Sequence, residues 1–366
     1  MSTSVEALFA PFPHVRLAQS ADQRPLREFH RSIAMKTNAL SLAYDYANAL
    51  ADPTEFVSLF EDEGRIQGTA TLACREARSE SGEVVPYGYL ANLRIAPKMS
   101  AGVRREWRRF YGALVAQAPD LEVAGRPRFM LTAILDDNVA AIRFLTKHLR
   151  EVTYRPVQRY ESVTTFGPTS LARTAVAGVL IRPATPDDEL GARAITIAKG
   201  LSGANAAFDA SHTVLAVRDG RIVAAVTVRH TPNRTLMITE ASRPMRWLLR
   251  ALRWLGVCRI DVPGPVRMAY LTDVRLSPAL SGRDRRGIFE AIASYAWHHL
   301  VKPSGAQAMC FASWPDFAAA TYALPRWLAV RTAGTLYEVV PAGAPGSPVL
   351  AQGAAAGPLP FDLTNS

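Results

Sequence analysis

Lysine is scarce in this sequence: only five of the 42 basic residues are lysines, and the rest are arginines. The formal net charge of the 366 residues is +10. A basic chain favours acidic partners such as phosphates, nucleotides, acidic carrier proteins, nucleic acid or anionic lipid. A solvated basic surface without any partner would carry the same charge, so charge alone does not select a function.

Cysteine is scarce too, with Cys74, Cys258 and Cys310 far apart in the chain. They lack a paired spacing, so neither a disulfide framework nor a zinc site is indicated, and their apolar neighbours predict buried, inert thiols. His298 and His299 are adjacent. Adjacent helical residues point about 100° apart and cannot chelate one ion together, so we predict no metal site.

Long apolar runs are also missing. No stretch approaches the ~18 residues that a membrane-spanning helix needs. The first residues lack the basic region and apolar run that are typical of a signal peptide. We therefore expect no transmembrane segment and a cytoplasmic protein.

The chain contains an internal repeat. YLANLRIAPKMSAGVRREW (residues 89–107) returns as YLTDVRLSPALSGRDRRGI (residues 270–288), with seven of nineteen positions identical. Further segments match in the same order: 15–23 with 181–189, 60–72 with 217–228, and 130–145 with 309–324. Each copy is typical of a strand, a helix, a β-hairpin, and then strands alternating with helices. This order predicts a mixed α/β sheet.

The repeat predicts two domains in tandem, related by a pseudo-twofold axis. They cover residues 1–167 and 178–341, and a small, polar linker at 168–177 joins them. Residues 342–366 are rich in Pro, Gly and Ala. We expect a tail there that is either disordered or draped over the protein.

The second copy carries an insertion, residues 231–266, that contains the helical sequence MRWLLRALRWLG. Arg246, Arg250 and Arg253 share one face at i, i+4 and i+7, and apolar side chains cover the rest. Three placements stay open: a lid packed across one domain, a dock for a carrier protein or the other half, or a helix on an anionic membrane surface. Apolar residues nearly all round favour burial.

The order of elements, with YLANLRIAP leading through a proline, a loop and a basic helix to LDDNVAAIRFL, resembles the GNAT superfamily of acyl-CoA N-acyltransferases. The resemblance covers nearly the whole chain, as two copies. It implies transfer of an acyl group, with acetyl as one candidate, from acyl-CoA to an amine. In that family the amides of the loop after the fourth strand, and the next helix N-terminus, hold the pyrophosphate of CoA. The pantetheine arm lies between the fourth and fifth strands.

On this resemblance the cofactor-binding residues lie in the two loops, at their helix starts and at the helix after the fifth strand. They are Ile95, Ala101, Gly102, Val103, Arg104, Arg105 and Asn138 in the first copy, and Gly282, Arg283, Arg285 and Arg286 in the second. Both loops depart from the family's glycine spacing, and arginines stand where small residues are usual. The arginines either supply new contacts to phosphate or mark loops that no longer bind CoA.

The fourth strand supplies the candidate catalytic residues. Asp273 stands where the family commonly has a carboxylate that deprotonates the amine, directly or through water, and Asn92 stands there in the first copy. The alternative is that Asp273 caps a bulge or pairs with an arginine. The family's tyrosine that protonates the leaving thiolate is not matched, because Leu145 occupies its place.

The sequence thus predicts an acyl-CoA-dependent N-acyltransferase with a small-molecule or peptide amine as acceptor. Two alternatives stay open: a degenerate binding or scaffold protein without catalysis, and an acyltransferase that takes its acyl group from an acidic acyl carrier protein. Nucleic-acid binding rests on charge alone, without a recognised motif. The sequence does not specify the acceptor, the acyl chain length, the working half or the oligomeric state.

Overall fold

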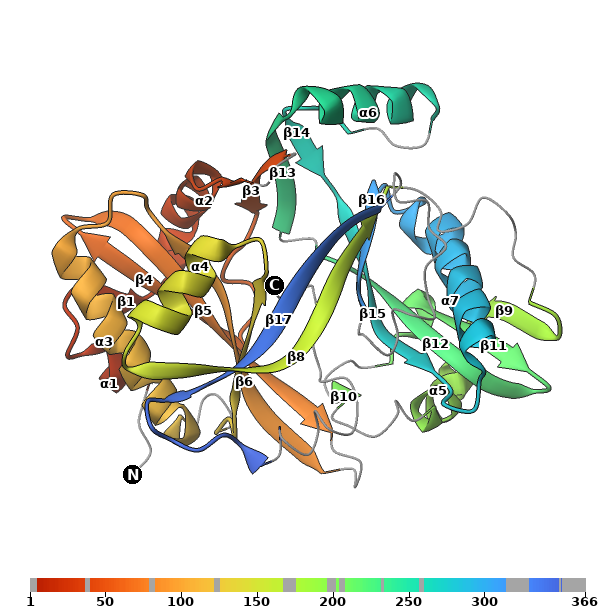
Figure 1. Ribbon diagram of the computed structural model, residues 1–366, viewed down its shortest axis with the longest axis horizontal. Coiled ribbons are helices and arrows are strands. Elements are labelled where there is room, and N and C mark those ends of the chain that lie inside the picture. The colour runs from red at the N-terminus through yellow and green to blue at the C-terminus, as the bar shows by residue number, and fades with distance from the viewer. Residues whose placement is uncertain are drawn as a thin grey trace.

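The computed structural model describes residues 5–36, 40–78, 83–121, 126–166, 176–195, 202–203, 208–231, 234–256, 260–313, 329–348 and 350 (Figure 1). The helices in this part are α1 (Val5–Phe9), α2 (Gln23–Ser32), α3 (Ala101–Gln117), α4 (Val139–Arg143), α5 (Glu189–Ala194), α6 (Arg243–Trp254) and α7 (Gly282–Ala296). A π-helical turn, η4 (Phe144–His148), continues α4, and another, η7 (Trp297–Val301), continues α7.

The strands are β1 (Val15–Leu17), β2 (Met35–Lys36), β3 (Leu40–Tyr46), β4 (Glu55–Asp62), β5 (Arg65–Arg78), β6 (Val84–Ile95), β7 (Met130–Leu135), β8 (Val152–Thr165), β9 (Val179–Pro183), β10 (Ser202–Gly203), β11 (Thr213–Arg218), β12 (Arg221–His230), β13 (Arg234–Ala241), β14 (Gly264–Val266), β15 (Met268–Leu276), β16 (Ala308–Ser313) and β17 (Ala329–Pro341). A 13-stranded sheet has the order β1-β4-β5-β6-β7-β17-β8-β16-β15-β12-β11-β9, with β10 beside β5. The pairs β6–β7 and β15–β16 are parallel, and all the others are antiparallel. The predicted mixed α/β sheet is confirmed.

The two halves of the chain exchange their last strands. β17, the last strand along the chain, lies between β7 and β8 and pairs with both, while β8 pairs with β16 (Figure 1). Leu336 on β17 is fully buried in a cluster with Tyr87, Tyr89 and Leu131 of the first half. The carboxyl-terminal strand therefore completes the core of the first half, which the repeat alone did not predict.

The domain limits at 1–167 and 178–341 remain predictions. Read inward from either edge, the large sheet has the same succession of an edge strand, a hairpin, and two parallel strands. This symmetry agrees with two copies of one plan. Most of the predicted linker, 168–177, lies outside the described residues.

The repeated stretch folds alike in both copies. β6 leads into α3, and β15 leads into α7. Ser100 and Ser281 cap these helices, since their hydroxyl oxygens accept the N–H of Val103 (3.4 Å) and of Asp284 (3.1 Å). The predicted apolar stripe of α3 is buried and comprises Val103, Trp107, Phe110, Tyr111, Leu114 and Val115.

The two predicted hairpins are confirmed as β4–β5 and β11–β12. Their turns run through Glu63–Gly64, with φ of 49° and 72°, and Asp219–Gly220, with φ of 51° and 73°. Two successive positive φ angles define the type I′ turn, whose twist matches that of a hairpin and which favours glycine at its second position. Gly64 and Gly220 therefore stand where the turn requires a positive φ.

A smaller sheet, of order β14-β13-β3-β2, joins the two halves through the antiparallel pair β13–β3. α6 buries Leu249 and Leu252 against residues of this sheet. The predicted helix is confirmed. The prediction that it is buried on all sides is wrong, because Trp247 is 70% exposed and Trp254 is 88% exposed. One leucine-bearing face is enough to pack a single helix on a sheet, so the tryptophans on the other face remain in solvent.

The described thiols and the described part of the tail agree with the sequence analysis. Burial raises the pKa of the Cys310 thiol, and it raises that of the half-buried Cys74 thiol to about 11, so both are poor nucleophiles; Cys258 lies outside the described residues. The Ser347 N–H donates to Glu338 (2.6 Å), and Leu350 is 1% exposed. This part of the tail is draped over the sheet, and residues 351–366 are outside the described part.

Two further findings concern membranes and metals. No described helix has the length and apolar character needed to cross a membrane. Among the described residues, no three or more His, Cys, Asp or Glu side chains gather in a way that could hold a metal ion.

Candidate functional site

β6 and β7 form a parallel pair that separates early. They are paired at only two positions, Gly88–Met130 and Tyr89–Leu131, although both strands run on toward their carboxyl ends. In the second copy, β15 and β16 are paired at four positions before they part. Each copy therefore has two neighbouring strand ends that are not joined by a backbone ladder. This is the point at which the sequence led us to expect the pantetheine arm.

Each copy has a β-bulge at the predicted catalytic position. Asn92 has φ 52° and Asp273 has φ 49°, in the left-handed region that Asn and Asp enter more readily than most residues. Opposite Asn92 the register of β5 shifts between Thr69 and Thr71, and β12 shifts at the same place in the second copy. Bulges re-aim side chains and are frequent next to active sites. The structure thus gives the two predicted residues equivalent positions, one in each copy.

The two bulge residues have different partners. The Tyr46 hydroxyl donates to Asn92 Oδ1 at 3.0 Å, and burial raises the pKa of Tyr46, so this hydroxyl keeps its proton at neutral pH. Asp273 Oδ1 accepts a hydrogen bond from Arg275 Nε at 2.9 Å. Asp273 therefore makes the arginine contact that the sequence left open as the alternative to a catalytic base.

Residues of both halves meet around Tyr44, on β3 beside the Asn92 bulge. The guanidinium carbons of Arg94 and Arg234 lie 5.2 and 5.1 Å from the centre of the Tyr44 ring. Arg234 also donates to the Tyr270 hydroxyl at 3.3 Å. An aromatic face attracts a cation electrostatically, so this stack helps to hold β3 against β6 and β13.

His30, on α2, lies behind Tyr46. It is 5% exposed, its ring centre is 4.6 Å from that of Tyr46, and its Nδ1 has no hydrogen-bond partner. Burial, with a smaller effect of the Arg94 charge, lowers the pKa of His30 to about 4. His30 is therefore neutral at pH 7.

We expect acid to destabilise the protein through His30. In the unfolded chain the imidazole of His30 takes up a proton with the ordinary pKa of about 6.5. In the folded chain it takes up that proton with a pKa of about 4. The contribution of His30 to the free energy of unfolding is therefore constant above about pH 6.5 and falls as the pH drops toward 4. The fall is roughly 2–3 kcal/mol between pH 7 and 4.5. Urea unfolding at these two pH values should show a smaller loss for His30→Gln than for the wild type. Equal losses would contradict this assignment.

The start of α3 suits an anion better than the start of α7. No acidic residue stands in the first turn of α3, whereas Asp284 stands in the first turn of α7 and pairs with Arg218 at 3.3 Å. Because a helix N-terminus carries partial positive charge, a resident carboxylate competes with an incoming anion. A Cβ added to Gly102 would meet only His14, at 3.8 Å, and one added to Gly282 would meet nothing within 4 Å. Both loops thus have open space above them.

Two of the predicted cofactor arginines brace their own loops. Arg104 Nη2 donates to the carbonyl oxygen of Met99 at 3.4 Å. Its counterpart Arg285 donates to the carbonyl oxygen of Pro278 at 2.6 Å. These guanidinium groups therefore hold the loop shape and have less capacity for a phosphate.

The next arginine differs between the copies. Arg286 pairs with Glu290 at 3.2 Å, one turn along α7. Its counterpart Arg105 is exposed and has no acidic partner within the described residues. Arg283 is exposed beside Asp284. The first copy therefore keeps Arg105 available near the helix start, whereas in the second copy the counterpart Arg286 is paired with Glu290.

The other predicted cofactor residues of the first copy lie around the same helix starts. Val103 is fully buried, so its side chain belongs to the core. Ile95 ends β6, and Ala101 begins α3 on the exposed side. Asn138 caps α4, since its Oδ1 accepts the N–H of Ala141 at 3.1 Å, which leaves its NH2 group as a donor.

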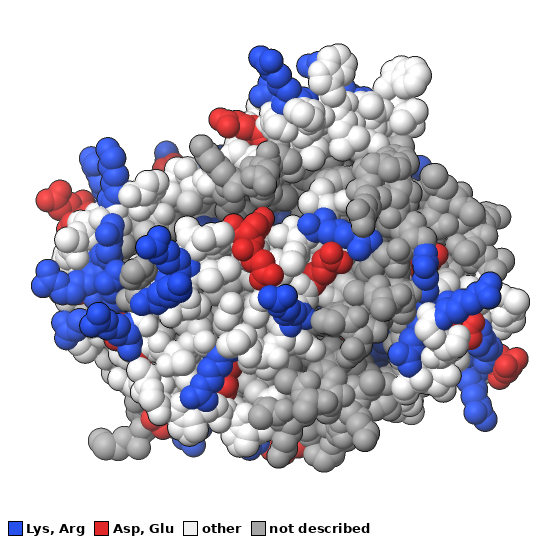
Figure 2. All heavy atoms as spheres, viewed as in Figure 1, with Lys and Arg blue, Asp and Glu red and all other residues white. Residues whose placement is uncertain are grey.

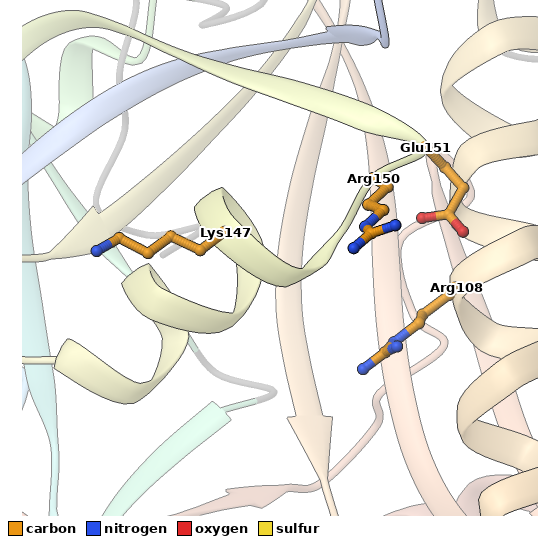
Figure 3. Close-up of a pocket in the computed structure, with 4 residues that line it drawn as sticks. All are labelled: Arg108, Lys147, Arg150 and Glu151. Atoms are coloured by element: carbon orange, nitrogen blue, oxygen red, sulfur yellow. The ribbon is translucent and has the colours of Figure 1, made fainter.

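A basic pocket lies between α3 and the end of α4. It has a volume of about 370 Å³ and is lined by Arg108, Lys147, Arg150 and Glu151 (Figure 3). Figure 3 shows Arg108 and Arg150 on the same side, near the Glu151 carboxylate, with Lys147 directed away. The Arg108 guanidinium lies 5.3 Å from the Phe144 ring, and its buried Nε has no hydrogen-bond partner.

This pocket was not predicted from the sequence. The available signal was Arg108, an arginine that stands off the apolar stripe of α3. Arg150 and Glu151 follow η4 and could not be assigned to α3 without the fold. In Figure 2, basic side chains gather over the part of the molecule that holds α2, α3 and α4.

No protein-family model and no curated protein matches this sequence. Solved structures that share its fold include an acetyltransferase and a myristoyltransferase. A GCN5-related N-acetyltransferase from Sphaerobacter thermophilus is 12% identical, with a TM-score of 0.51 over 91% of this chain and 96% of that one. N-myristoyltransferase from Saccharomyces cerevisiae, with bound myristoyl-CoA and inhibitors, is 9% identical, with a TM-score of 0.52 over 95% of this chain and 87% of that one. The chain therefore has the GNAT N-acyltransferase fold, as the sequence predicted.

Proposed function

We propose that this protein transfers an acyl group from an acyl-CoA to an amine, and that the first copy holds the donor. One observation carries the proposal: an α3 N-terminus without acidic residues, with Arg105 exposed, stands beside two parallel strands that part. Helix N-termini and arginines bind phosphate. The shared fold supports an acyltransferase, and one structural neighbour is described with bound myristoyl-CoA.

In this proposal the donor lies along the first copy. The pyrophosphate contacts the amides at the start of α3, with Gly102 leaving room above them. Arg108 lies about 10 Å further along the helix at 1.5 Å per residue, and its pocket takes another phosphate of the CoA nucleotide. The pantetheine arm enters between β6 and β7, and its thioester reaches the bulge at Asn92.

The second copy is proposed to shape the site rather than bind a donor. Asp284, Arg286 and Asp273 are each already engaged in an ion pair there. The second copy also supplies Arg234, which stacks on Tyr44 beside the first bulge. A site built in this way uses both halves, although only one holds the cofactor.

The proposed reaction is attack of a neutral amine on the thioester carbonyl. A C–N bond forms, the C–S bond breaks, the thiolate leaves as CoA, and the amine's proton passes to solvent. Because Tyr46 holds the oxygen of the Asn92 amide, the NH2 group is the donor left for the oxyanion. Leu145, which is 6% exposed, stands where the family has its tyrosine acid, so the proposal assigns no acid to that position.

If the Asn92 amide is the oxyanion donor, substitutions at the two bulge residues should affect kcat differently. Asn92→Asp should lower kcat by about 100-fold or more, the usual cost of losing an oxyanion donor, because a carboxylate cannot donate. Asp273→Asn, its counterpart, should leave kcat within about threefold, because Asp273 only pairs with Arg275. Both residues tolerate the left-handed backbone, so the two proteins should fold alike. Steady-state acyl transfer from acyl-CoA to an amine panel measures both.

The opposite pattern would favour the role first predicted from the sequence, in which Asp273 is the base and the second copy works. A protein that binds acyl-CoA but supports no transfer, with both variants indistinguishable from wild type, would indicate a binding or scaffold protein. Nothing in the fold or in the comparisons favours an acyl carrier protein as donor. Comparing acyl-CoA with acyl-carrier donors in the same assay tests that alternative.

A further inference from the structure

Helix α6 exposes a face of tryptophan and arginine. At about 100° per residue, Arg243, Trp247, Arg250 and Trp254 fall within an arc of about 60°. Trp247 is 70% exposed and Trp254 is 88% exposed, and the Arg250 guanidinium lies 5.8 Å from the Trp247 ring. The opposite face, which carries the leucines, is packed on the small sheet. The tryptophan–arginine face has no covering element within the described residues.

The helix is also basic. It carries Arg243, Arg246, Arg250 and Arg253 among its 12 residues and no aspartate or glutamate. Arg253 pairs with Asp261, and Arg246 donates to a backbone carbonyl. Arg243 and Arg250, which share the face of the tryptophans, have no acidic partner in the described part of the chain. In Figure 2, basic and uncharged side chains project together where α6 lies.

We propose that α6 docks the protein on an anionic lipid bilayer, with Trp247 and Trp254 at the level of the headgroups and Arg243 and Arg250 at lipid phosphates. Tryptophan prefers the membrane–water interface because its ring is apolar while its N–H donates a hydrogen bond. Basic side chains near an anionic bilayer add attraction. This docking does not depend on the proposed acyl transfer.

The shape of this surface favours a bilayer over a protein partner. Figure 1 shows α6 standing apart from the main body, on the outside of the small sheet. Its exposed face is therefore convex and unshielded, and a flat surface can reach the whole of it, whereas a protein partner would need a matching groove. The 12 residues of α6 span about 18 Å, against the ~30 Å of a bilayer core. The helix therefore lies in the interface rather than crossing it.

Vesicle flotation tests this docking with the full chain. Wild-type protein should float with vesicles of phosphatidylcholine and phosphatidylglycerol and remain behind with pure phosphatidylcholine. Arg243→Glu with Arg250→Glu should weaken partitioning by at least about 30-fold. The matched control, Arg65→Glu with Arg221→Glu, makes the same change of net charge at the exposed turns of the two hairpins, and should change partitioning by less than about threefold.

Brominated lipids locate the tryptophans. They should quench wild-type fluorescence, and the quenching should disappear in Trp247→Ala with Trp254→Ala, which are surface changes and should leave the melting temperature unchanged. Three results would overturn the docking proposal: no vesicle binding by the wild type at low salt, equal loss in the hairpin control, or retention of quenching in the double tryptophan variant. Binding of an acidic carrier protein through α6, without binding of vesicles, would assign the same face to a protein partner instead.

Discussion

Replacing Arg105 and Arg108 together by glutamine is expected to weaken acyl-CoA binding by about 100-fold. Arg105 is exposed at the start of α3 without an acidic partner, and Arg108 has a buried Nε without a hydrogen-bond partner. A hydrogen bond between a charged arginine and a phosphate contributes roughly 1.5–3 kcal/mol, so the loss of two such bonds corresponds to about 100-fold or more in Kd. Isothermal titration with acetyl-CoA and with a long-chain acyl-CoA measures the change.

The second copy provides the control for this experiment. Arg283→Gln with Arg286→Gln removes two arginines from the first two turns of α7 and should change Kd by less than about threefold, because Arg286 is already paired with Glu290 and Arg283 stands next to Asp284. Arg108 also packs on Phe144, so the melting temperature of each variant should be recorded. If the two pairs of substitutions weakened acyl-CoA binding equally, binding would depend on net charge rather than on arginine contacts in the first copy.

Leu336→Ala is expected to destabilise the first half of the protein, although Leu336 belongs to the last strand of the second. Leu336 is 0% exposed and lies in a cluster with Tyr87, Tyr89 and Leu131. Truncating a buried leucine costs about 2–5 kcal/mol because a cavity replaces packed atoms. Native-state hydrogen exchange should therefore lose protection first in β6 and β7.

Leu215→Ala is the matched control, since Leu215 is also 0% exposed and lies on β11 within the second half. It should lower protection in β11 and β12 and leave β6 and β7 protected. If Leu336→Ala instead lowered protection mainly in β15 and β16, β17 would be completing the second half, and the exchange of last strands would be wrong.

The sequence predicted the parts of the fold that depend on local patterns. The repeat of YLANLRIAP and YLTDVRLSP placed two strands and the helices that follow them in register, because side-chain periodicity acts over a few residues. The exchange of β8 and β17 was not predictable in this way. Both strands close a β-rich segment at the end of a half, so local pattern does not select which of them pairs with β7; long-range packing, such as that of Leu336, decides between them.

The site residues Asn92, Asp273 and the loop arginines were named from the family resemblance, and their roles stay predictions. The resemblance placed them on the fourth strands and in the loops that follow. It could not show which arginines are already engaged, because partners such as Glu290 and the Pro278 carbonyl are known only once the chain is folded. Burial of α6 was predicted wrongly because tryptophan was counted with the core residues, whereas in a helix that packs through one face it also serves as an exposed interfacial residue.

The central claim is that the first copy holds the acyl-CoA, and a structure of the full chain with a non-hydrolysable acyl-CoA analogue tests it most directly. The account predicts the pyrophosphate at the start of α3, the nucleotide beside Arg108, and the pantetheine arm between β6 and β7 with its carbonyl at Asn92. A pantetheine arm between β15 and β16, or an unoccupied first copy at millimolar analogue, would contradict it.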